Sequence, residues 1–317
     1  MLDTHTFLME LYVMVDDFCQ QTATVLESAV RPGPAPSLSQ SEVVTLGLFS
    51  QWQRFRSERD FYRFAQSHLR CLFPHLPHRT QFNRLLRRHH PLLSAVFEQV
   101  VGQLQAAPGY DFCYEALDTS AIATRDAKRR GCGWLPEQAQ IGWGNRIGWF
   151  EGFRLLISVN PQGIITGFCF GSGNAKEQPL AEDFLEARQH PHPRCATVGA
   201  KSHGFYVCDK GFEGQAAQKR WQQEYGARVL CPSKRNAQTQ PAWPKSLRRW
   251  AAGIRQVVES VFAKLHHTFG LNRERPHDLV GFQVRLLAKV ALHNFCILCN
   301  WKRQRPAMAF ADLLLWN

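Results

Sequence analysis

Three acidic residues occupy positions from which a carboxylate could do chemistry. Asp118 lies within the apolar run YEALDTSAI, which predicts a β-strand, although strands are normally poor in Asp. Asp209 ends the short apolar run FYVCD, and Glu259 lies in a segment with helical periodicity, IRQVVESVFAKLHHTFG. Carboxylates are preferred ligands of Mg²⁺. Two such ions about 3.5–4 Å apart can activate an attacking oxygen and stabilise a leaving oxygen in phosphodiester chemistry.

Each of these carboxylates also has an ordinary structural interpretation. Asp118 fits a solvent-facing position on a half-exposed strand, and Asp209 fits the N-cap of a following helix. Glu259 fits an exposed residue paired with Arg255, four positions before it. Glu115 is the nearest competitor of Asp118, but strand alternation predicts that it points to the opposite face. A metal site therefore requires a fold that brings all three carboxylates together.

The elements that must position these residues alternate along the second part of the chain. A strand meander followed by alternating helices and strands predicts an α/β fold, with a ribonuclease-H-like mixed sheet flanked by helices. A Rossmann fold would begin with strictly alternating strands and helices, and no G-x-G-x-x-G sequence is present. The predicted strands cover 111–123, 152–160, 163–171, 205–209 and 228–233, and the predicted helices cover 179–189, 212–224, 247–269 and 277–300.

The first part of the chain is predicted to be helical. Ser39 and Glu42 form a capping-box pattern before an apolar run, so a helix is expected to begin there. Other helices are expected over 1–30, 57–69 and from Thr80, with a Pro/Gly-rich break at 31–37. We therefore divide the chain into a helical region, 1–108, and a catalytic domain, 109–317.

The helical region is rich in arginine and aromatic residues between positions 39 and 90. Short basic helices of this kind are typical of a helix-turn-helix-like DNA-binding module. In that interpretation the helix over 80–89 lies on a duplex through Arg84, Arg87 and Arg88. The alternative is a helical bundle with a solvated basic face.

Composition limits the possible partners and compartments. The chain has 317 residues, of which 44 % are apolar, and a formal net charge of +12, which favours a polyanionic partner. The alternative is a basic protein with no such partner. No basic segment precedes the first apolar block, which argues against a secretory signal. No stretch predicts a membrane-spanning helix. Ten scattered cysteines suggest reduced thiols, as in a prokaryotic cytoplasm or a nucleus.

The segments LDTSAI, YVCDKGF and RQVVESVFAKLHHTFGLNRERPH resemble bacterial insertion-sequence transposases of the DDE class, most closely those of insertion-sequence family 982. The resemblance covers most of the chain, including SLSQSEVVTLGLF, GWFEGFRLLISVN and LLAKVALHNFCILCNW. Neighbouring families carry a Tyr three residues before the Arg of the Glu-bearing helix and a Lys seven residues after the Glu. This chain departs from that signature with Ala252 and His266.

The resemblance implies that Asp118, Asp209 and Glu259 are the catalytic residues and the ligands of two Mg²⁺ or Mn²⁺ ions. Water would free a 3′-OH at an insertion-sequence end, and that hydroxyl would attack target DNA. The implied partners are double-stranded DNA, at the element ends and at the target, and further copies of the chain, as a homo-oligomer on synapsed ends. The implied location is the nucleoid of a prokaryotic cytoplasm, without a membrane.

Charge and sequence proximity suggest that Arg255, Lys210 and Arg125 contact DNA phosphates near the metals. Three alternatives remain: a nuclease of the same fold that does not join DNA, a DNA-binding protein without catalysis, and an inactive, decayed copy of a transposase. A Gly/Trp-rich segment over 131–144 is interpreted either as a DNA-stacking loop, through Trp134 or Trp143, or as a plain ordered loop. The set His293, Cys296 and Cys299 is interpreted as part of a helical core rather than a zinc site.

Overall fold

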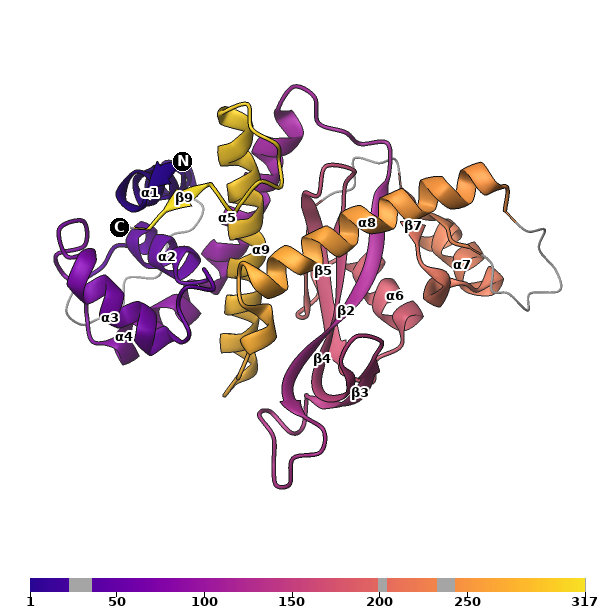
Figure 1. The fold of residues 1–317 in the computed structure, drawn as a ribbon, viewed down its shortest axis with the longest axis horizontal. Coiled ribbons are helices and arrows are strands. Elements are labelled where there is room, and N and C mark those ends of the chain that lie inside the picture. Colours follow the sequence, from indigo (N-terminus) through magenta and orange to yellow (C-terminus); the bar gives the residue numbers. More distant parts are fainter. Residues whose placement is uncertain (23–35, 199–203, 233–242, 317) are drawn as a thin grey trace. The chain divides into compact units, whose positions relative to one another are not determined.

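The chain forms two compact units, seen here in a computed structural model (Figure 1). The structure describes residues 1–22, 36–198, 204–232 and 243–316, so most of the predicted break at 31–37 lies outside the described residues. The helical unit comprises residues 1–100, 268–270 and 280–317. The sheet unit comprises residues 101–267 and 271–279.

Helices of different lengths around an aromatic core make up most of the helical unit. The predicted capping box is confirmed at the start of α2: Ser39 N–H donates to Oε2 of Glu42 at 2.6 Å, and Glu42 N–H donates to Oγ of Ser39 at 3.1 Å. The core rings include Phe7, Phe49 and Phe61. The unit contains β1 (Leu2–Asp3), α1 (Thr4–Thr22), α2 (Gln40–Phe49), α3 (Glu58–His68), α4 (Arg79–Arg88), α5 (His90–Ala106, in part), α9 (Leu279–Lys302) and β9 (Leu314–Leu315).

The long helix α9 belongs almost entirely to the helical unit, whereas the sequence-based division assigns it to the catalytic domain, 109–317. Lys289 shows why the grouping differs from that division. Its buried ammonium donates to Oε1 of Gln51 at 2.9 Å and to the carbonyl of Phe269 at 2.7 Å, so α9 is tied to the end of α2. Among the described helices, α9 alone is apolar and long enough to cross a membrane, and 89 % of its apolar window is buried, as in a core helix.

A mixed sheet forms the centre of the sheet unit, as predicted. Its strand order is β6-β5-β4-β2-β7-β8, with β3 paired to the start of β4. β4 pairs in antiparallel fashion with β2, β3 and β5, and β5 pairs in antiparallel fashion with β6. β7 is parallel to β2 and to β8. The strands are β2 (Glu115–Asp126), β3 (Gln140–Gly144), β4 (Gly148–Val159), β5 (Ile165–Ser172), β6 (Cys195–Thr197), β7 (Phe205–Cys208) and β8 (Arg228–Leu230).

The predicted hairpin between β4 and β5 is confirmed. Asn160 N–H donates to the carbonyl of Ile164 and Gly163 N–H donates to the carbonyl of Asn160, both at 3.0 Å. Gly163 has a φ of 84°, a conformation that glycine adopts without strain. The Gly/Trp-rich segment differs from the predicted loop, because its end forms β3 and pairs with β4.

Helices cover both faces of the sheet. Alternation along β2 defines the faces: Leu117 packs in a core with α6 (Glu177–Ala187) and α7 (Gln215–Tyr225), whereas Ser120 contacts His266 of α8 (Lys245–His267). In Figure 1, α8 runs across the front of the sheet, with α6 behind it. The 3-10 turns η1 (Lys210–Phe212) and η2 (Leu271–Arg273) complete the unit.

Glu115 lies on the α6 face, opposite Asp118, as strand alternation predicts. Its carboxylate pairs with Arg188 at 2.6 Å and accepts hydrogen bonds from Thr166 at 2.9 Å and from Ser158. Both charged side chains are buried, at 2 % and 7 % exposure. This buried, hydrogen-bonded ion pair links the end of α6 to the sheet, which leaves Glu115 committed to the core.

Candidate active site

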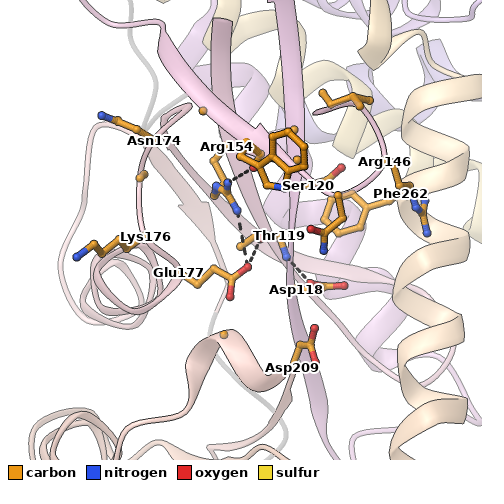
Figure 2. A pocket seen from close by; sticks show the side chains of 18 of the residues that line it. Asp118, Thr119, Ser120, Arg146, Arg154, Asn174, Lys176, Glu177, Asp209 and Phe262 are labelled. Carbon is orange, nitrogen blue, oxygen red and sulfur yellow. Dashed lines mark hydrogen bonds and ion pairs between the residues drawn. The ribbon is translucent and has the colours of Figure 1, made fainter. Parts of the chain in front are cut away.

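A pocket of about 1010 Å³ opens on the sheet unit, and Asp118, Asp209 and Glu259 all line it. Its walls come from β2, the β3–β4 hairpin, the start of α6, the turn after β7, and α8. Figure 2 shows Asp118, Glu177 and Asp209 together in this pocket. The fold therefore brings the three carboxylates selected from the sequence into one cavity.

Parallel pairing of β2 with β7 positions the two aspartates. Leu117 of β2 is in register with Cys208, the last residue of β7. Asp118 and Asp209 come directly after these two residues, so they lie at neighbouring positions. Each carboxylate accepts a backbone N–H at 2.7 Å, from Thr119 and from Lys210 respectively. Asp209 also caps η1, so its structural interpretation as an N-cap holds together with its place in the pocket.

Arg255 links the helix-borne carboxylate to the strand-borne ones. Its guanidinium lies 3.2 Å from Oδ2 of Asp209 and 3.5 Å from Oε1 of Glu259. The helical pair between Arg255 and Glu259 is therefore present, and the same guanidinium also reaches the sheet. Arg146 approaches the other oxygen of Glu259 at 3.5 Å.

The three carboxylates do not by themselves form a closed metal site in this conformation. In the described part of the chain, one set of metal-ligating side chains has ligand atoms that all lie within 4.8 Å of one another, and this set does not include Asp118, Asp209 or Glu259. The guanidinium of Arg255 lies between Asp209 and Glu259.

Burial raises the pKa of Asp118 to about 7. Removal from water is the largest cause, and the negative charges of Asp209 and Glu177 raise the pKa further. The hydrogen bond from Thr119 N–H and the charge of Arg255 oppose this rise. A further cation placed beside Asp118 would favour the ionised carboxylate.

Glu177 is a fourth carboxylate in the pocket that sequence reasoning missed. Its Oε1 accepts from Oγ1 of Thr119 at 2.9 Å and lies 3.7 Å from the guanidinium of Arg154 (Figure 2). A β-carbon at Gly211 would overlap its Oε2, so the glycine after Asp209 leaves room for this carboxylate. Glutamate in the first turn of a helix is common, so the sequence carried no distinguishing signal.

The three cations predicted near the metals have different surroundings. Arg255 lines the pocket, as described above. Lys210 is exposed and follows Asp209 directly, but it does not line the pocket. Arg125 has a side chain only 7 % exposed, 3.8 Å from Glu151 and bonded to the carbonyl of Arg129. Arg125 is therefore largely buried and has its partners away from the three carboxylates, whereas Arg255 pairs with two of them.

His266 is the residue at which this chain departs from the lysine of neighbouring families, and its surroundings differ from those of a phosphate-binding cation. Its Nε2 lies 3.0 Å from Oγ of Ser120. Burial lowers the pKa of His266 to about 4, and His267 and Arg146 lower it further. The imidazole is therefore neutral near pH 7 and supplies no positive charge for a phosphate.

The β3–β4 hairpin presents aromatic rings beside the carboxylates. Trp143 and Trp149 are 51 % and 62 % exposed, and their ring centroids are 5.4 Å apart. Trp134 instead packs edge-on against His277 at 4.5 Å. Of the two tryptophans proposed to stack on bases, Trp143 is thus the more accessible one.

The arginines predicted to lie on a duplex belong to α4 of the helical unit. Phe82 and Leu86 bury one side of this helix, while Arg84 and Arg88 are exposed and Arg87 is half-buried. The helix therefore presents a basic face, as both the DNA-binding interpretation and the solvated-face interpretation require.

Comparison with known proteins gives one family match. The family described as "Transposase DDE domain" matches residues 116–295, which is 180 of the 317 residues and includes all three carboxylates. Among solved structures, a chain of the Mos1 strand transfer complex is similar over 88 % of this chain and 85 % of that chain, at 13 % identity and a TM-score of 0.23. No curated protein matches the chain.

Proposed function

The chain belongs to the family of transposase DDE domains, and from this premise we propose that it cleaves DNA at the ends of an insertion sequence and joins them to target DNA. Asp118, Asp209 and Glu259 are the proposed catalytic residues and metal ligands. The observation that carries the proposal is their convergence in one pocket from β2, the end of β7 and α8.

The residues present fit the divalent metal ions that this family generally uses. Carboxylate oxygens are hard ligands suited to Mg²⁺ or Mn²⁺. The proximity of Asp209 and Glu177 to Asp118 and the guanidinium between Asp209 and Glu259 indicate a site in which carboxylates are grouped and a cation stabilises them. Glu177, beside Asp118, enlarges the same donor set. We propose two ions held by Asp118, Asp209 and Glu259.

When bound, the ions supply a deprotonated oxygen nucleophile near neutral pH and charge stabilisation for the leaving oxygen. Asp118 would hold an ion as the ionised carboxylate. Arg255, whose guanidinium lies at the pocket beside Asp209 and Glu259, is the proposed first contact to a DNA phosphate. Lys210, exposed beside Asp209, is the proposed second phosphate contact.

The remaining roles follow from surface charge and from the resemblance. We propose that α4 of the helical unit binds duplex DNA through Arg84, Arg87 and Arg88, and that a homo-oligomer holds two ends together. The order of β5, β4, β2, β7 and β8 supports a ribonuclease-H-like interpretation of the sheet. We also propose membership in insertion-sequence family 982, a bacterial origin and a location at the nucleoid.

The test is cleavage of a supercoiled plasmid that carries the DNA flanking the gene, with Mg²⁺ or Mn²⁺. We expect Asp118→Asn, Asp209→Asn and Glu259→Gln each to abolish nicking while binding to the same DNA persists, because each removes a metal ligand but no positive charge. Asp126→Asn is the matched control, since it changes an exposed aspartate at the other end of β2. Near-normal nicking by any one of the three variants would remove that residue from the site.

A second substrate separates the proposed function from its alternatives. A duplex with a free 3′-OH at the element end is incubated with plasmid, and joined products are measured. Cleavage without joining identifies a nuclease, and binding that is unaffected by Asp118→Asn in a protein with no cleavage identifies a DNA-binding protein without catalysis.

A further inference from the structure

Cys169, His192 and Cys195 form a cluster of metal-ligating side chains on the edge of the sheet away from β7. Cys169 is fully buried in β5, Cys195 is half-buried at the start of β6, and His192 lies in the segment that leads from α6 to β6. One ligand atom of each lies within 4.8 Å of the other two. The carboxylate pocket uses none of these residues.

Backbone pairing brings the two sulfurs together. Phe170 N–H donates to the carbonyl of Arg194 at 3.1 Å, so these two residues form a hydrogen-bonded pair of the β5–β6 ladder. Cys169 and Cys195 are the next partners along the ladder. They therefore form a non-hydrogen-bonded pair, in which opposed side chains approach most closely.

The histidine completes a short ligand turn, His192-x-x-Cys195. Cys195 N–H donates to the carbonyl of His192 at 3.1 Å, which folds the turn back. Nδ1 of His192 lies 3.3 Å from Sγ of Cys195. In a tetrahedral zinc site, bond lengths of about 2.3 Å to sulfur and 2.0–2.1 Å to nitrogen place these two atoms about 3.5 Å apart. The present spacing is therefore close to that of bound ligands.

We propose that Cys169, His192 and Cys195 bind one Zn²⁺ ion, at a site separate from the carboxylate pocket. The fourth ligand is water or Asp183, which adjoins the cluster: its backbone carbonyl lies 3.8 Å from Sγ of Cys195, and its carboxylate pairs with Arg194 at 3.3 Å. Two sulfurs and an imidazole favour zinc over the Mg²⁺ that suits the carboxylates.

Binding changes the protonation of the thiols. The contact with Cys169 and burial raise the pKa of the Cys195 thiol, so this thiol keeps its proton without a metal. The ion binds thiolates, so each thiol proton is released to solvent when its sulfur coordinates. No oxidation is involved, because Zn²⁺ and both sulfurs keep their oxidation states.

A metal at this site would stabilise the edge of the sheet. β6 has only three residues and pairs with β5 alone among the described strands. A metal bound to Cys169 of β5, Cys195 of β6 and His192 would fix the edge strand and the segment leading from α6. The ion therefore stabilises the folded chain relative to the unfolded chain.

Co²⁺ is the probe, because it replaces zinc and gives a sulfur-to-cobalt charge-transfer band only when thiolates coordinate it. The full-length, reduced, metal-free protein carrying Asp209→Asn is titrated with Co²⁺ and then with Zn²⁺. We expect one equivalent of Co²⁺ to produce the band and Zn²⁺ to remove it. Cobalt at the carboxylate pocket gives no such band, so failure of this proposal is distinguishable from failure of the proposed function.

His192→Gln is the decisive variant, with His190→Gln as its matched control two residues away on the exposed part of the same segment. Loss of a direct ligand should weaken Co²⁺ binding by at least about 100-fold, since residues that only support ligands already contribute about 10–100-fold. His190→Gln should bind as the parent does, and Zn²⁺ should raise the melting temperature of the parent and of His190→Gln only.

Three results would overturn the proposal. They are absence of the charge-transfer band in the reduced parent, an equal affinity for Co²⁺ in His192→Gln and His190→Gln, and a purified protein that carries a Cys169–Cys195 disulfide and binds no Co²⁺ after that disulfide has been reduced. Loss of the band in Cys195→Ser with native circular dichroism would support the proposal through a second ligand.

Discussion

Replacement of Asp118 by asparagine should stabilise the protein at neutral and alkaline pH while removing the proposed activity. Burial raises the pKa of Asp118 from 3.8 to about 7 in the folded protein. Between these two values the folded chain holds a proton at Asp118 that the unfolded chain has lost. Stability therefore falls as pH rises through this window, and the full penalty is present above about pH 7.

The magnitude follows from the two pKa values. At about 1.4 kcal/mol per pKa unit, a rise from 3.8 to about 7 corresponds to about 4 kcal/mol. An asparagine side chain at this position cannot ionise, and its oxygen can still accept from Thr119 N–H. The free energy of unfolding of Asp118→Asn should exceed that of the parent by about 1 kcal/mol near pH 4.5, and by about 4 kcal/mol near pH 8.

The assay is urea unfolding in EDTA at a series of pH values, with Asp126→Asn as the control for loss of an exposed carboxylate from the same strand. Addition of Mg²⁺ near pH 8 should stabilise the parent more than Asp118→Asn, because the ion favours the ionised carboxylate. A difference between parent and variant that stays constant from pH 4.5 to pH 8 would refute the inference that burial disfavours ionisation of Asp118.

Two further predictions concern the core and the DNA-binding surface. Arg188→Met leaves the buried Glu115 without its partner, and the free energy of unfolding measured in urea should fall by about 3–5 kcal/mol; an equally stable variant would contradict the assigned role of this ion pair. Arg84→Ala combined with Arg88→Ala should weaken duplex binding and lower the slope of log affinity against log salt by about 2; an unchanged slope would indicate that α4 does not touch phosphates.

Local patterns in the sequence were sufficient for many elements. The capping box at Ser39 and Glu42 and the hairpin turn at Asn160–Gly163 depend on residues close in sequence, and both are confirmed. The opposite orientations of Glu115 and Asp118 follow from strand alternation. These features could be predicted because hydrogen bonds between near neighbours and side-chain periodicity determine them.

Other features depend on contacts between distant segments. α9 has the apolar composition of a core helix, but its assignment to the helical unit depends on partners such as Gln51, more than two hundred positions away. Glu177 could not be distinguished from an ordinary helix-start glutamate, because its place in the pocket depends on Gly211 and Arg154. Arg125 was selected for charge, yet its side chain is committed to Glu151.

The candidate site shows the same division. Residue types and spacing identified Asp118, Asp209 and Glu259 as carboxylates in a strand, at a strand end and on a helix, because these environments leave local patterns. Their convergence depends on the parallel register of Leu117 with Cys208 and on α8 crossing the sheet, and Arg255 reaches Asp209 only through that crossing. Protonation of Asp118 is likewise a property of the folded chain, since burial and neighbouring charges exist only after folding.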